Sequence, residues 1–202
     1  MAGFRRRAVR VVFAAAIVAV AARVEAADWQ FRPFLGFTFA GDTTFVDFDH
    51  AIGQHHATFG VTAAWIGEVV GVDVDLAHMP GFFQTGEPGA LVISSGVTTL
   101  TGNVVVAVPH RLTEYVLRPY IVGGAGVMRV SEQDYLSALP ISVARPAIDF
   151  GAGAVGFITK QVGLAWEVRR FQSVGAEQQT GLSIGGEKLS FWRATMAVAI
   201  RY

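Results

Sequence analysis

Residues 29–40 alternate in character, and this two-residue period constrains the fold more than any other feature of the chain. The odd positions are mostly apolar and the even positions mostly small or polar: Trp29, Phe31, Pro33, Leu35, Phe37 and Phe39 against Gln30, Arg32, Phe34, Gly36, Thr38 and Ala40. Successive side chains of a β-strand point to opposite faces, whereas a helix repeats every 3.6 residues. The segment is therefore predicted to be a strand with one apolar face.

The same alternation recurs along the rest of the chain, and it predicts eight strands in total. Their approximate ranges are 29–40, 57–67, 70–77, 96–108, 117–130, 146–159, 162–169 and 192–202. The segment 117–130 is ambiguous as to face, because it contains several glycines. Glycine in a strand indicates tight curvature or close packing, as in a narrow barrel.

The links between these segments alternate in length. Four are long, at about 41–56, 80–95, 131–145 and 173–190, while those at 67–68, 110–115 and 160–161 are short. Bacterial outer-membrane barrels have short periplasmic turns and long external loops. The pattern predicts an all-β fold, namely an eight-stranded antiparallel up-and-down transmembrane β-barrel. It also predicts an outer-membrane location with both termini on the periplasmic side.

The composition supports strands that face lipid. Apolar residues make up 52% of the chain and charged residues only 16%, whereas soluble domains carry about 25% charged residues. The mean hydropathy is +0.43. Beyond the N-terminus no run of about 18 apolar residues occurs, so membrane-spanning helices are excluded. The chain also has no cysteine, so disulfides cannot hold it together.

The N-terminus has the features of a secretory signal. Arg5, Arg6, Arg7 and Arg10 precede an apolar run at 11–22, and cleavage is expected before Ala27. The sequence thus divides into a signal peptide, 1–26, and one barrel domain, 27–202. The mature chain would keep 11 basic and 15 acidic residues, since the signal removes five of 16 and one of 16. This acidic balance argues against nucleic acid as a partner.

The strand registers also predict the lumen and the membrane boundary. Eight charged residues fall opposite the apolar faces: Arg32, Asp73, Asp75, Asp149, Glu167, Arg169, Arg193 and Arg201. Because side chains just fill an eight-stranded barrel and lone buried charges are costly, we expect an internal ion-pair network and no open aqueous pore. Aromatic residues near strand ends are predicted to form interfacial girdles: Trp29, Phe31, Trp65, Tyr120, Trp166, Trp192 and Tyr202.

The mature chain resembles the small eight-stranded outer-membrane β-barrels typified by the OmpA transmembrane domain. The residues that carry the resemblance are Arg118-Pro119-Tyr120 with Gly123, Gly124 and Gly126, then 149–153, 162–169 and the terminal strand 191–202. The resemblance implies that the last strand, which ends on aromatic Tyr202, is read by the barrel-assembly machinery. It also implies outer-membrane lipid as the surroundings of the barrel.

No catalytic, cofactor or metal site is predicted. His50 with Asp47 and Asp49, and Ser94 with Ser95, are candidates for lipid-modifying chemistry, but their spacing enforces no nucleophile–base geometry. Asp47, Asp49, His50, His55 and His56 could supply metal ligands, yet a solvated loop explains them as well. His78 and His110 carry no further signal. Gly123-Gly124 and Gly185-Gly186 lack the Lys-Ser/Thr of a phosphate loop.

The sequence therefore favours a structural or surface-exposed, non-enzymatic barrel that acts through its extracellular loops, in adhesion or membrane integrity. Apolar residues in those loops, such as Phe45, Phe48 and Phe82, suit contact with an external ligand or surface. The alternative is a narrow channel for small hydrophobic molecules. A lipid-modifying outer-membrane enzyme is the third and least favoured hypothesis.

Overall fold

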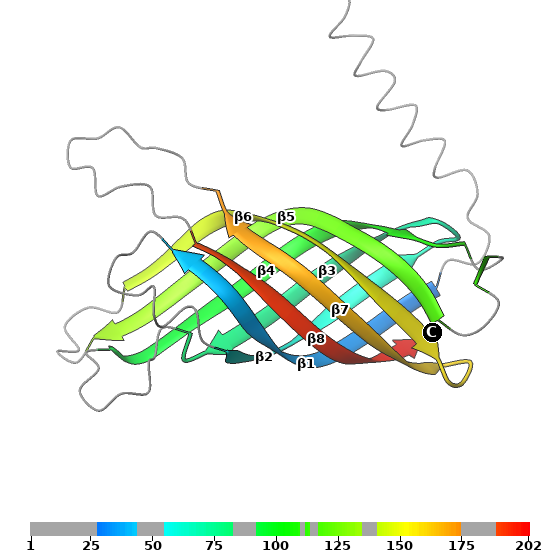
Figure 1. Cartoon of the computed structure of the whole chain (residues 1–202), viewed down its shortest axis with the longest axis horizontal. Coiled ribbons are helices and arrows are strands. Elements are labelled where there is room, and N and C mark those ends of the chain that lie inside the picture. The colour runs from blue at the N-terminus through cyan, green and yellow to red at the C-terminus, as the bar shows by residue number, and fades with distance from the viewer. Residues whose placement is uncertain are drawn as a thin grey trace, which may run out of the picture.

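The computed structural model describes residues 28–43, 55–82, 92–109, 112–113, 117–134, 141–174 and 189–202. The predicted signal peptide lies outside these residues. Figure 1 shows a closed barrel whose strands run obliquely to its long axis, as ring closure requires. The eight strands are β1 (Asp28–Thr43), β2 (His56–Ile66), β3 (Val70–Pro80), β4 (Val92–Ala107), β5 (Leu117–Asp134), β6 (Ile141–Phe157), β7 (Val162–Ser173) and β8 (Leu189–Arg201).

Every strand pairs antiparallel with its neighbours in sequence, and β8 pairs with β1 to close the ring. The closing pair is joined from Gln30↔Arg201 to Thr43↔Leu189, with a register shift between Phe39 and Asp42. Ala40 lies in this shift with a φ of 47°, so the C-terminal end of β1 contains a bulge. The predicted all-β, up-and-down antiparallel barrel is confirmed.

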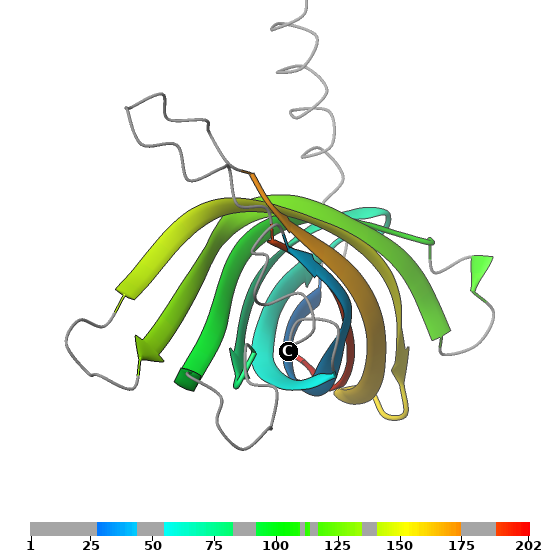
Figure 2. The same cartoon turned by 60° about the vertical axis from the view of Figure 1, so that its left-hand side comes forward.

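The two ends of the barrel domain lie at the same end of the ring. The Arg201 guanidinium lies 3.2 Å from the Asp28 carboxylate, and the amide of Tyr202 donates to the carbonyl of Trp29 at 3.0 Å. The links 67–69, 108–116 and 158–161 are at this end, which we call the short-link end. Figure 1 shows the C-terminus at this end, near the turn between β6 and β7, and Figure 2 shows the curved wall of the barrel from a second direction.

The opposite, long-link end carries the links 44–55, 81–91, 135–140 and 174–188. The predicted alternation in link length is confirmed for 44–55, 81–91 and 174–188. It is wrong for the link 135–140, for which the sequence predicts a longer span, 131–145. This link is shorter than the link 108–116 because β5 and β6 continue to pair as far as Glu132↔Ile141. These two strands have 18 and 17 residues, whereas about 9–11 suffice to cross the hydrocarbon.

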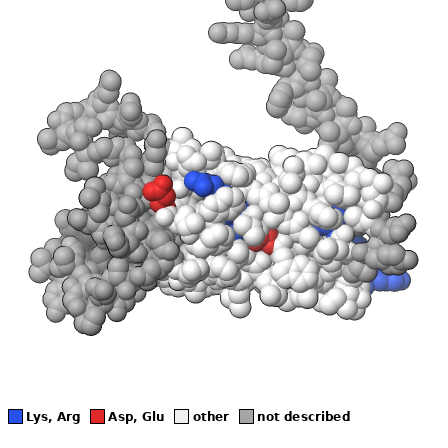
Figure 3. Space-filling view, in the orientation of Figure 1, with Lys and Arg blue, Asp and Glu red and all other residues white. Residues whose placement is uncertain are grey.

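The wall of the barrel alternates in exposure as a membrane barrel does. Along β3 the outward Val72 and Val74 are about half exposed, whereas the inward Asp73 and Asp75 are 2% and 0% exposed. The visible face of the described barrel in Figure 3 is almost entirely uncharged, with a few isolated charged spots. A wall of exposed apolar side chains around a polar interior is stable only when lipid covers it. Among the described residues, no helix has the length and apolarity needed to cross a membrane.

The inward side chains form three layers along the barrel. An apolar layer near the short-link end contains Phe34, Ile66, Val105, Val122, Val155 and Ala199, among others. A second apolar layer near the long-link end contains Met79, Phe82, Val97, Met128, Phe171 and Phe191, among others. Charged side chains lie between them. The lumen is thus a packed core with a polar middle.

Two glycines make room for the largest side chains of the short-link layer. A Cβ added at Gly60 would lie 2.2 Å from the backbone carbonyl oxygen of Leu76 and 2.5 Å from the ring of Phe34. One added at Gly153 would lie 2.6 Å from the carbonyl oxygen of Trp166 and 2.7 Å from the ring of Tyr120. Real carbon atoms do not approach that closely, so any larger residue would force both these rings and the neighbouring strand to move. The glycines of this sequence therefore set how tightly the lumen packs.

The prediction that Tyr120 belongs to an aromatic girdle is wrong. Tyr120 is 4% exposed, because the even positions of β5 face the lumen. Glycines at 123, 124 and 126 carry no side chain that would have marked the two faces in the sequence. The outward orientation of Trp29, Trp166 and Tyr202 is confirmed by exposures of 60%, 44% and 82%.

Candidate functional site

Arg169 of β7 is the centre of the charged layer inside the barrel. Its Nη2 donates to Asp73 of β3 at 2.9 Å, its Nη1 donates to Asp149 of β6 at 3.2 Å, and its Nε donates to Glu167 on the same strand. The side chain is 0% exposed. Three carboxylates from three strands therefore satisfy one guanidinium, which has five donors in a fixed plane.

A second ion pair lies beside the first. Arg193 of β8 donates to Asp75 of β3 at 2.9 Å, and Thr62 of β2 donates to the same carboxylate at 2.9 Å. The guanidinium of Arg193 lies 4.8 Å from the ring centroid of Phe34 and 4.7 Å from that of Phe171. These contacts attach the charged layer to the apolar layer on each side of it.

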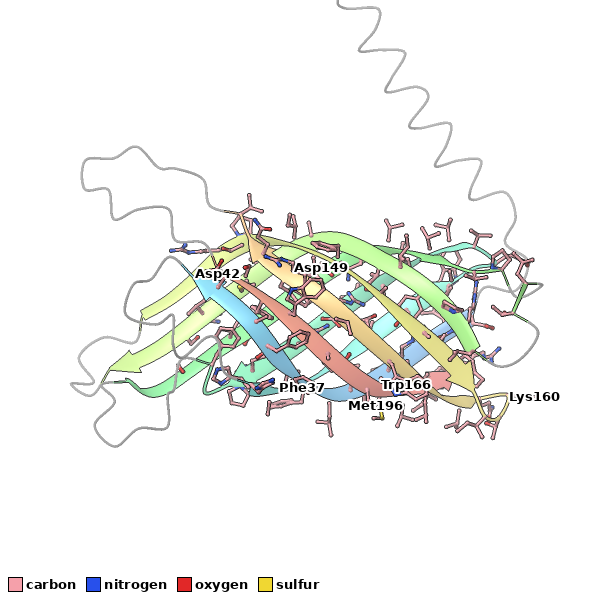
Figure 4. All side chains as sticks on the ribbon, viewed as in Figure 1. Phe37, Asp42, Asp149, Lys160, Trp166 and Met196 are labelled. Atoms are coloured by element: carbon pink, nitrogen blue, oxygen red, sulfur yellow. The ribbon has the colours of Figure 1, made fainter. Side chains whose placement is uncertain are left out.

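Tyr120 and Arg32 complete the polar layer. The Tyr120 hydroxyl donates to Glu167 at 2.8 Å and accepts from Arg32 at 3.2 Å. Arg32 also donates to Gln30 at 2.6 Å. Asn103 of β4 donates to Asp73 at 2.6 Å. The network thus includes residues from all eight strands, β1 to β8. Figure 4 labels one of them, Asp149 of β6, which is buried.

The internal ion-pair network predicted from the sequence is confirmed for six of the eight residues: Asp73, Asp75, Asp149, Glu167, Arg169 and Arg193. Arg32 is buried but bonds to neutral partners, and Arg201 lies at the short-link mouth, 25% exposed against Asp28. Arg169 and Asp75 are 0% exposed. Because a hydrated channel would wet these groups, the lumen between the described strands is closed at this level.

The comparisons with known proteins concern this fold. Neither a protein-family model nor a curated protein matches the sequence. The solved structure of Neisserial surface protein A, NspA, is similar with a TM-score of 0.60 and 11% identity, covering 88% of this chain and 100% of that one. The outer membrane protein OprG from Pseudomonas aeruginosa has a TM-score of 0.54 and 12% identity, covering 88% of this chain and 97% of that one.

The N-terminal β-barrel domain of Pseudomonas aeruginosa OprF is also similar, with a TM-score of 0.50, 12% identity, and coverage of 88% of this chain and 100% of that one. The fold is that of the small outer-membrane β-barrels. The resemblance seen in the sequence is thereby confirmed. At such low identity the likeness concerns the fold alone, so the function of this outer-membrane-type barrel must come from its own residues.

Arg118 is an interior residue whose structural role is not predicted from the sequence. Its guanidinium donates to the carbonyl oxygens of Val108, Gly67 and Glu68 at 2.9, 2.7 and 2.8 Å. Arg118 therefore holds two of the short links together at the mouth of the barrel. The available signal was its charge, because a charged side chain in a membrane-spanning strand faces the lumen. The period of two would then have placed Tyr120, two residues further on, inside as well.

The candidate catalytic and metal-binding residues are not brought together by the described part of the chain. His50, Asp47 and Asp49 lie outside the described residues, as do His110 and the side chain of Ser94. Ser95 is buried inside β4, whereas His78 faces outward and bonds to Thr98 at 2.9 Å.

The two adjacent histidines of the candidate metal cluster lie in different surroundings. His55 is exposed and contacts the ring of Phe37 at 5.8 Å, while His56 is buried and contacts the ring of Phe82 at 5.3 Å. Within the described residues no three His, Cys, Asp or Glu side chains are grouped so that they could hold a metal ion. The chemistry available in the barrel is therefore that of a closed polar core and an apolar wall.

Proposed function

We propose that this protein is a non-enzymatic outer-membrane barrel that acts at its long-link end, in surface adhesion or in the integrity of the membrane. The observation that carries the proposal is the closed lumen. Arg169, Asp73 and Asp75 are buried between two apolar layers, so the barrel offers no wet path along which a solute could pass. A folded barrel with a sealed core serves to hold its external links in place.

The proposed orientation has both termini and the short links in the periplasm. The shared end of Asp28 and Arg201 supports it, because barrels of this class place their short turns on the periplasmic side. Protease added to intact cells should then cleave within a long link such as 174–188 and leave the turn 158–161 intact. Cleavage at 158–161 in intact cells would reverse the orientation.

Conductance separates this proposal from the alternative, a narrow channel for small hydrophobic molecules. The purified barrel in planar bilayers should give no ion conductance, and vesicles that contain it should take up small hydrophobic solutes no faster than protein-free vesicles. Specific uptake would support the channel and contradict the structural role.

To test the role of the external links, a variant must replace a long link and still form the folded barrel. Replacing residues 175–188 by a short Gly/Ser linker should abolish attachment of cells to surfaces, or raise their sensitivity to detergent, while the barrel still shifts its mobility in SDS gels on heating. The matched control replaces the turn 158–161, which should change neither property. Equal effects of both replacements would show that the phenotype comes from a damaged barrel.

The barrel-assembly machinery is a proposed partner, recognised through the C-terminal strand. Tyr202 is 82% exposed, and its amide rather than its ring makes the bond to Trp29. Tyr202→Ala should therefore lower the amount of assembled barrel in cells but leave spontaneous refolding into lipid vesicles unchanged. An equal loss in both settings would mean that the ring stabilises the barrel itself.

A further inference from the structure

An apolar groove lies on the outside of the barrel across β1, β8 and β7. Its volume is about 850 Å³, and its lining includes Leu35, Phe37, Trp166, Ala194, Met196 and Val198. Figure 4 shows Phe37, Trp166 and Met196 on the same side of the barrel, projecting from the wall. Ala194 pairs with Phe37 on one side and with Val168 on the other. The small side chain of Ala194 thus leaves a hollow beside a large aromatic ring.

An aromatic cluster that holds a cation lies next to this groove, on the side of the long-link end. Trp192, two residues before Ala194 on the same face of β8, stacks on Phe39 at 6.4 Å and meets the edge of Phe150 at 6.1 Å. The guanidinium of Arg170 lies 5.6 Å from the Trp192 ring centroid, and its Nη2 is 3.5 Å from the Ser190 hydroxyl.

Arg170 lies on the outward face of β7. Among the described residues, no carboxylate lies within ion-pair distance of its guanidinium. Asp42 of β1 pairs with Ser190, on the far side of β8 from Arg170. A guanidinium has five donors, and the contacts to Trp192 and Ser190 leave most of them available.

A cation above an apolar groove matches the chemistry of one kind of occupant. Aromatic side chains of membrane barrels mark the depth of the lipid headgroups, so Arg170 lies where a headgroup phosphate would lie. From Ala194 to Val198 the groove follows β8 for about 13 Å. Because barrel strands tilt by about 40°, this is about 10 Å of depth, a third of the ~30 Å hydrocarbon core. An acyl chain fits this groove in length and polarity, and it would lie directly below the cation.

We propose that this face binds a phosphorylated, net anionic lipid of the leaflet at the long-link end, with one acyl chain in the groove over Ala194 and its phosphate against Arg170. The guanidinium fork suits a phosphate, and Trp192 keeps that fork oriented. The inference rests on the placement of the wall in lipid but not on any role of the long links.

Tryptophan quenching tests the proposal in the intact barrel. With Trp29→Phe and Trp65→Phe, the remaining tryptophans are Trp166 in the groove and Trp192 above it. The barrel is reconstituted in phosphatidylcholine vesicles with a minor fraction of lipid brominated on its acyl chains. Brominated phosphatidylglycerol should quench about fivefold more effectively than brominated phosphatidylcholine, the enrichment expected from one cation near the surface.

Three variants in this background decide the outcome. Arg170→Gln should reduce the preference to about one, and Ala194→Phe, which fills the groove but keeps the charge, should reduce it too. Arg129→Gln, which removes an outward arginine on β5, should leave it unchanged. Each variant must still shift its mobility in SDS gels on heating.

Other results would overturn the proposal. If Arg170→Gln keeps the preference, the cation is not the headgroup contact, and if Arg129→Gln loses it equally, the attraction is diffuse. If Ala194→Phe changes only self-association in cross-linking, the groove takes a second copy of the chain. Absence of quenching by either lipid would instead mean that the wall is not in lipid, and the proposed function would fail with it.

Discussion

Replacement of Arg169 by methionine tests the charged layer most directly. Methionine keeps much of the volume but removes the guanidinium that contacts Asp73, Asp149 and Glu167. Arg193 remains paired with Asp75 at 2.9 Å and lies 4.0 Å from Glu167. Among the described residues, Asp149 would then have no basic partner within 4.0 Å, and Asp73 would keep only its bond from Asn103.

The expected loss follows from these contacts. Breaking a buried ion pair by removing one partner costs about 3–5 kcal/mol, because the other charge stays buried without compensation. Here one cation serves three acids, so we expect the free energy of unfolding to fall by at least about 3 kcal/mol. Protonation of the stranded carboxylates limits the loss and keeps it near this range.

The assay is reversible urea unfolding in lipid vesicles, followed by tryptophan fluorescence. Arg129→Met removes the same charge from the outer face of β5 and should change stability by no more than about 0.5 kcal/mol. In the Arg169→Met background, Asp149→Asn should restore about 1 kcal/mol or more, since it removes one stranded charge. If Arg169→Met costs no more than Arg129→Met, the reasoning about the network is refuted.

Three further predictions concern other parts of the barrel. Val74→Arg places a charge on the half-exposed wall and should cost about 2–4 kcal/mol in vesicles, while the same change at Val69, between β2 and β3, should cost little. Tyr120→Phe removes the 2.8 Å bond to a buried carboxylate and should cost about 1–3 kcal/mol in the same titration. Arg118→Met removes the bonds to three carbonyl oxygens and should speed amide hydrogen exchange in the turns that it holds; unchanged exchange would contradict this role.

The features of the fold that lipid enforces were predictable from the sequence. A residue on the outside of the wall must be apolar and a charged residue must face the lumen, so the period of two in β1, β3 and β7 marks both faces. This rule alone predicts that Asp73, Asp75, Glu167 and Arg169 face the lumen, and the structure confirms it.

Features of the fold that contact with lipid does not impose are predicted poorly from the sequence. The hairpin of β5 and β6 extends to Glu132↔Ile141, past the length that the hydrocarbon requires, and there no alternation is imposed on the sequence. In the middle of β5 the glycines hide the face, so Tyr120 was assigned to the outside. Arg170 departs from the rule that charged side chains face the lumen, because it lies on the outward face with its guanidinium against the ring of Trp192.

The partners within the lumen could not be predicted because ring closure decides them. Arg169 and Asp73 are 96 positions apart, and Arg193 and Asp75 are 118 apart, yet each pair meets across the barrel interior. Alternation shows only that a side chain points inward, whereas the strand number and stagger determine which inward side chains meet. The network is therefore specific to this closed ring. It follows that a change in the interior charges should act on stability and closure of the lumen, whereas a change at the links or at Arg170 should act on what the barrel contacts.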